Sequence, residues 1–165
     1  MTTPNLSIRT LVATPRLLAA WGLVGYAGLY LAFTFLDWVL PGGGTFGVRS
    51  AGAGFTTLVE LALPLAGLLF ASGAGVASPL KQTRVIATVA LIEYAFAVFF
   101  GTLAFLIGLG SLGGGSVKAA FDAIGFVVLG LGRLGLAALA GLVVYQAWAR
   151  VGGVLPVKLV RVRAN

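Results

Sequence analysis

The sequence has no cysteine and no histidine, and Met1 is its one methionine. These absences exclude disulfide frameworks, zinc and iron–sulfur sites, serine–histidine–aspartate triads and thiol catalysis. Charge is also scarce, because only 9% of the residues are charged, whereas soluble domains average about 25%. In contrast, 59% of the 165 residues are hydrophobic, and the mean hydropathy is +1.07. We therefore expect a membrane protein that is not an enzyme and binds no cofactor.

Four apolar stretches are long enough to cross a bilayer as helices, which takes about 20 residues each. They cover, approximately, residues 17–38, 53–77, 80–109 and 117–149. Helix starts are indicated by Thr14-Pro15 and Ser78-Pro79, since each places a capping hydroxyl before a proline. The sequence thus predicts an all-α integral membrane protein. It forms a single domain over residues 1–165, with four transmembrane helices in an antiparallel bundle.

Basic residues near the span ends predict the orientation, because they concentrate on the cytoplasmic side. Both termini are expected to be cytoplasmic, which places on that side Arg9, Arg16, Lys81, Arg84, Arg150, Lys158, Arg161 and Arg163. Only Arg49 and Lys118 then fall on the outer side. A cleaved signal peptide is disfavoured, since the first apolar stretch is too long and no small-x-small site precedes Asp37. Abundant arginine, alanine and glycine indicate a bacterial source, and hence its plasma membrane.

The charges inside the apolar stretches share a helical face with small residues. Residues at i, i+4, i+7 and i+11 form one stripe of a helix. On this spacing Glu60, Glu93, Asp122 and Arg133 each lie on a face that carries helix-packing candidates, namely Gly67, Ala71, Gly75, Ala97, Gly101, Gly130 and Ala137. Ionisable groups in a membrane normally face the bundle interior, and small residues let backbones approach closely. We therefore expect a polar seam inside the bundle.

Arg133 has two candidate partners in this seam. From its expected depth a long guanidinium reaches either Glu60 or Glu93, and one acid is then left unmatched. Pro64 also lacks the amide hydrogen that would bond the carbonyl of Glu60. The seam is interpreted either as a packing device, as a transport or proton-relay site, or as a contact that a partner chain completes.

Two other readings of the sequence are disfavoured. The segment Gly113–Lys118 resembles a phosphate-binding loop only in composition, because its order is wrong and no strand precedes it. A net charge of +7 would suit nucleic acid, but the cytoplasmic bias already accounts for it. The basic tail, residues 150–165, is instead expected to contact anionic lipid headgroups through Arg150, Lys158, Arg161 and Arg163.

Four spans with cytoplasmic termini and small outer loops resemble MARVEL-type membrane-organising proteins in topology. No functional residue follows from that resemblance. We expect a non-enzymatic organiser that self-associates or acts as an accessory subunit of a larger membrane assembly. The alternative is a small ion channel or proton-coupled transporter that uses Glu60, Glu93 and Arg133.

Overall fold

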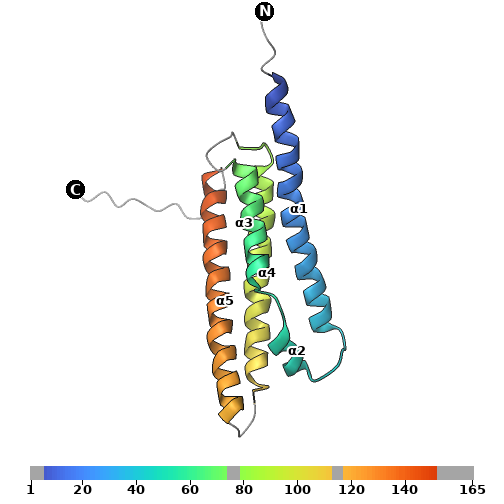
Figure 1. The fold of residues 1–165 in the computed structure, drawn as a ribbon, viewed down its shortest axis with the longest axis vertical. Helices are drawn as coiled ribbons and strands as arrows, with labels where there is room; N and C mark the ends of the chain where they lie inside the picture. Colours follow the sequence, from blue (N-terminus) through green and yellow to red (C-terminus); the bar gives the residue numbers. More distant parts are fainter. Residues whose placement is uncertain (1–5, 74–78, 113–116, 152–165) are drawn as a thin grey trace, which may run out of the picture.

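The computed structural model describes residues 6–73, 79–112 and 117–151, and throughout these ranges the regular structure is helical. The helices are α1 (Leu6–Val39), α2 (Phe46–Gly52), α3 (Leu58–Ser72), α4 (Thr83–Leu109) and α5 (Val117–Arg150). Four of them lie side by side and alternate in direction along the chain, whereas the short α2 lies between the lower ends of α1 and α4 (Figure 1). The all-helical, antiparallel arrangement that we expected is present.

Three helices are long and apolar enough to cross a membrane: Thr14–Val39 of α1, α4 and α5. They indicate a multi-pass membrane protein. The third helix in the bundle, α3, has 15 residues and is about 22 Å long at the usual rise, whereas the hydrocarbon core is about 30 Å thick. The fourth crossing expected over residues 53–77 is therefore not formed by a full-length helix within the described part of the chain.

The late start of α3 follows from its capping residues. Thr57, in an extended conformation, is the N-cap, and the segment that precedes it is not helical. Thr57-x-x-Glu60 is the capping-box spacing, in which the acidic side chain turns back to the N-cap amide. At the other end Gly73 is left-handed, with φ of 82°, a conformation that glycine adopts at little cost. Glu60 consequently lies in the first turn of α3 rather than inside a longer span.

The two predicted helix starts at prolines were wrong. The first helix begins at Leu6 and runs through Pro15, which leaves only the carbonyl of Leu11 without its usual donor. The fourth helix begins at Thr83, after Pro79. Its start is delayed because the Thr83 hydroxyl bonds the carbonyl oxygens of Ala71 and Leu80, at 2.9 and 2.7 Å. These bonds tie the end of α3 to the beginning of α4.

Helices pack where small residues let backbones meet. A Cβ on Gly67 of α3 would stand 2.7 Å from Val24 Cγ2 and 3.0 Å from the carbonyl oxygen of Ala20, both on α1. The predicted packing residues Gly67, Ala71, Ala97, Gly101 and Ala137 are all buried, and Gly130 is half-buried against the Phe105 ring. Gly75 lies outside the described residues.

We predict that Gly67→Ala destabilises the bundle, because the added methyl group meets a backbone oxygen that cannot move freely. Overpacking of this kind costs about 1–3 kcal/mol. Gly22→Ala on α1 is the matched control, since nothing lies within 4 Å of its Cβ position. Thermal unfolding in detergent, followed by circular dichroism, should show a lower midpoint for Gly67→Ala alone. Equal midpoints for the two variants would contradict this account of the α1–α3 contact.

Candidate functional site

Glu60 is buried near the α1–α3 contact, with 7% of its surface exposed. Its carboxyl group interacts with the amide and hydroxyl of Thr57 and with the hydroxyl of Tyr30. The positive end of the α3 dipole adds a further favourable interaction with a negative charge at this position. One oxygen, Oε2, nevertheless has no hydrogen-bond partner among the described residues. Glu60 thus caps the first turn of α3 and still has one acceptor oxygen without a partner among the described residues.

Glu93 lies at the middle of α4 and is as buried as Glu60, with 8% of its surface exposed. Mainly apolar side chains surround it. It packs on Gly28 of α1, where an added Cβ would stand 2.9 Å from Glu93 Oε1. Its Oε2 also has no partner within the described ranges. The site therefore contains a second carboxyl group, which has neither a cap nor a cation beside it.

The structure brings these two carboxyl groups to one small cavity of about 10 Å³, which Glu60 and Glu93 line together with apolar side chains such as Leu31 and Phe55. Pro64 borders the same cavity, and the Tyr94 hydroxyl donates a hydrogen bond to the carbonyl of Leu61. The first two turns of α3 therefore form one wall of the cavity. Two acids from different helices meet there in an apolar surrounding.

Arg133 lies elsewhere. It is exposed, and no ion pair joins it to Glu60 or Glu93 among the residues that the structure describes. The helix register gives the reason: Leu134 and Phe55 both meet the Cβ position of Gly101, and the rings of Phe55 and Trp38 are 5.6 Å apart. Arg133 is thus level with Trp38, about ten residues or 15 Å along α1 from Gly28 and Glu93.

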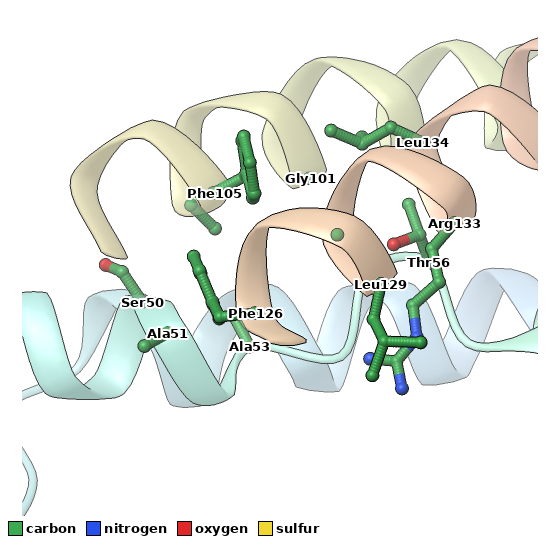
Figure 2. Close-up of a pocket in the computed structure, with 12 residues that line it drawn as sticks. Ser50, Ala51, Ala53, Thr56, Gly101, Phe105, Phe126, Leu129, Arg133 and Leu134 are labelled. Atoms are coloured by element: carbon green, nitrogen blue, oxygen red, sulfur yellow. The ribbon is translucent and has the colours of Figure 1, made fainter. Parts of the chain in front are cut away.

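Arg133 instead lines a separate pocket of about 140 Å³ between α4, α5 and the segment before α3. Figure 2 shows Phe126 reaching toward Phe105, with which it stacks at 5.4 Å, whereas the Arg133 side chain extends beside Leu129. Most of the other side chains that line this pocket are apolar. Among the described residues that line it, none other than Arg133 is charged, so the pocket provides no ion-pair partner for the arginine.

The other predicted site residues lie at the ends of α5. Asp122 is exposed and pairs with Lys118 at 2.9 Å, which satisfies its charge outside the cavity of the two glutamates. Arg150 is the exposed last residue of the helix. Lys158, Arg161 and Arg163 lie outside the described residues.

One feature was not anticipated from the sequence: an open pocket of about 640 Å³ between α1, α2 and the start of α3. Polar side chains line it, among them Asp37, Arg49, Tyr30 and Thr57. Tyr30 and Thr57 are also the neighbours of the Glu60 carboxyl group. The Thr57-x-x-Glu60 spacing was the signal in the sequence that places Glu60 at a helix start, next to this pocket.

No family model matches the chain, and no curated protein or solved structure matches it either.

We predict that Tyr94→Phe destabilises the junction of α3 and α4, because it removes the hydrogen bond to the Leu61 carbonyl. A hydrogen bond of this type contributes about 1 kcal/mol. Tyr26→Phe on α1 is the control, as that side chain is 59% exposed. The thermal midpoint in detergent should fall for Tyr94→Phe and stay constant for Tyr26→Phe. Identical midpoints would show that the Tyr94 hydroxyl does not support α3.

Proposed function

We propose that the protein is a non-enzymatic membrane subunit that associates laterally, with further copies of itself or within a larger membrane assembly. The outer face of α5 supports this proposal. Three glycines of this helix, Gly125, Gly132 and Gly135, have nothing within 4 Å of their Cβ positions. The large side chains beside them, such as Val128 and Leu139, are about 60% exposed. This face therefore has no partner within the described chain.

Glycine at these positions calls for an explanation. Inside a helix it is about 1 kcal/mol less favourable than alanine, and no contact within the chain requires it here. Another helix that approaches closely would require it, since small residues bring helix backbones together in membranes. Arg133 does not belong to this face, because it lies on the stripe of buried Ala137 and Ala140 and lines the pocket toward α4.

The proposed setting is a cell membrane, with both termini and Arg150 on the cytoplasmic side near anionic lipids. Trp21 and Trp148 support it, because they bond Gln82 and Thr88 at 2.7 and 2.9 Å near the start of α4. This end also carries Arg16, Lys81 and Arg84. It combines an aromatic belt with the basic residues expected at a cytoplasmic interface.

For lateral association, we predict that Gly132→Leu raises the dissociation constant about tenfold, or by about 1.4 kcal/mol, because the larger side chain separates the facing helices. Gly22→Leu on α1 is the matched control, because its Cβ position also has nothing within 4 Å and it lies away from the outer face of α5. Energy transfer between labelled copies in liposomes measures self-association, and cross-linking in native membranes detects a different partner. Association of Gly132→Leu at the wild-type strength in both experiments would contradict the proposal.

Topology can be tested with single cysteines, because the chain has none of its own. Thr45→Cys and Leu112→Cys should react with an impermeant thiol reagent added outside intact cells, whereas Lys81→Cys should react only after lysis. Labelling of Lys81→Cys from outside would reverse the proposed orientation. Labelling of all three from one side would show that the helices do not cross the membrane as proposed.

A further inference from the structure

We propose that Glu60 and Glu93 form a proton-binding site, in which Glu93 carries the proton and Glu60 exchanges it with the pocket between α1 and α2. This function is independent of lateral association, and it uses the two carboxyl groups that α5 does not reach. Its basis is the shared cavity and the unpartnered oxygen on each of two nine-tenths-buried side chains.

The surroundings of the two carboxyl groups are unequal. Glu60 has the Thr57 amide, two hydroxyl groups and the α3 dipole to support a negative charge. Glu93 has Gly28, Leu31, Ile92 and Phe96 around it in a second pocket of about 170 Å³. An unpaired charge in such apolar surroundings is strongly unfavourable. The asymmetry assigns the negative charge to Glu60 and the neutral acid form to Glu93.

No positive charge competes with the proton at this site. The ionisable side chains that face the two carboxyl groups are Tyr30 from α1 and Tyr94 from α4. Among the described residues that line the cavity there is no lysine or arginine: Arg49 of α2 lines the open pocket and Arg133 of α5 lines the other one. We therefore infer that a bound proton, rather than a basic side chain, neutralises Glu93.

The size of the small cavity excludes the larger cations from the space between the two carboxyl groups. About 10 Å³ is room for one water molecule at most. Calcium requires six or more oxygen ligands, and magnesium usually keeps several waters. A proton needs only an acceptor. Binding is the reaction of the Glu93 carboxylate with hydronium, which gives the carboxylic acid and water, and the new O–H group can donate to the free oxygen of Glu60.

The open pocket provides the route. Tyr30 and Thr57 line its wall and also contact the Glu60 carboxyl group. Water in the pocket can thus deliver a proton to Glu60 through these hydroxyl groups, and Glu60 passes it across the small cavity to Glu93. Tyr30 and Thr57 relay the proton in this scheme, whereas the two glutamates hold it.

Infrared spectroscopy of the purified full-length protein in detergent tests the site. The chain has four acidic side chains, and exposed carboxyl groups are ionised at neutral pH. We expect the wild type to show the C=O stretch of a protonated carboxyl group at neutral pH. Glu93→Gln should remove the band, whereas Glu60→Gln and the control Asp122→Asn should keep it. Absence of the band from the wild type, or its survival in Glu93→Gln, would overturn the proposal.

The route is tested by the kinetics of the same band after transfer to deuterated water. Exchange of the carboxyl proton should slow several-fold in Glu60→Gln and in Tyr30→Phe, because each removes a group between the pocket and Glu93. Tyr26→Phe, one turn away on the exposed face of α1, should exchange at the wild-type rate. Equal rates in all four proteins would show that the proton does not enter through the pocket.

Discussion

Close approach of helix backbones at small residues is the constraint on which the rest of this structure depends. At Gly67 the backbone of α3 meets α1 so closely that a methyl group would not fit, and at Gly101 and Gly28 neighbouring side chains occupy the space that a Cβ would take. Lipid does not drive helices together as water does, so such packing carries much of the association. One oxygen of Glu60 and one of Glu93 have no hydrogen-bond partner among the described residues of this packed interior.

The stripe of small residues predicted much of this packing, because helical periodicity determines which residues share a face. Depth was harder to predict. Arg133 is central in the apolar stretch of α5, yet the helix register sets it level with Trp38 and away from Glu93. Periodicity within one helix contains no information on how far that helix slides past its neighbour. The predicted pairing of Arg133 with Glu93 depended on that offset.

Glu60 has two roles in the structure, as a helix cap and as a buried acid, and the sequence alone does not distinguish them. As the third residue after the Thr57 cap, it interacts with an amide that the first turn of α3 leaves free. As a buried acid, it borders the cavity that contains the Glu93 carboxyl group. A capping role explains why a carboxylate is tolerated there, whereas no comparable contact supports Glu93. The asymmetry between the two acids therefore originates in local helix chemistry.

The shortness of α3 has a consequence for the lipids around the protein. Acyl chains beside α3 meet an apolar helix of about 22 Å, whereas those beside α4 meet one of about 40 Å. Exposed Leu58, Val59 and Leu69 show that α3 does present a face to its surroundings. A bilayer adapts to such unequal hydrophobic thickness by thinning locally, at a cost that grows with each ångström of mismatch. The protein would therefore deform its annulus on one side only, and thin membranes would accommodate it better than thick ones.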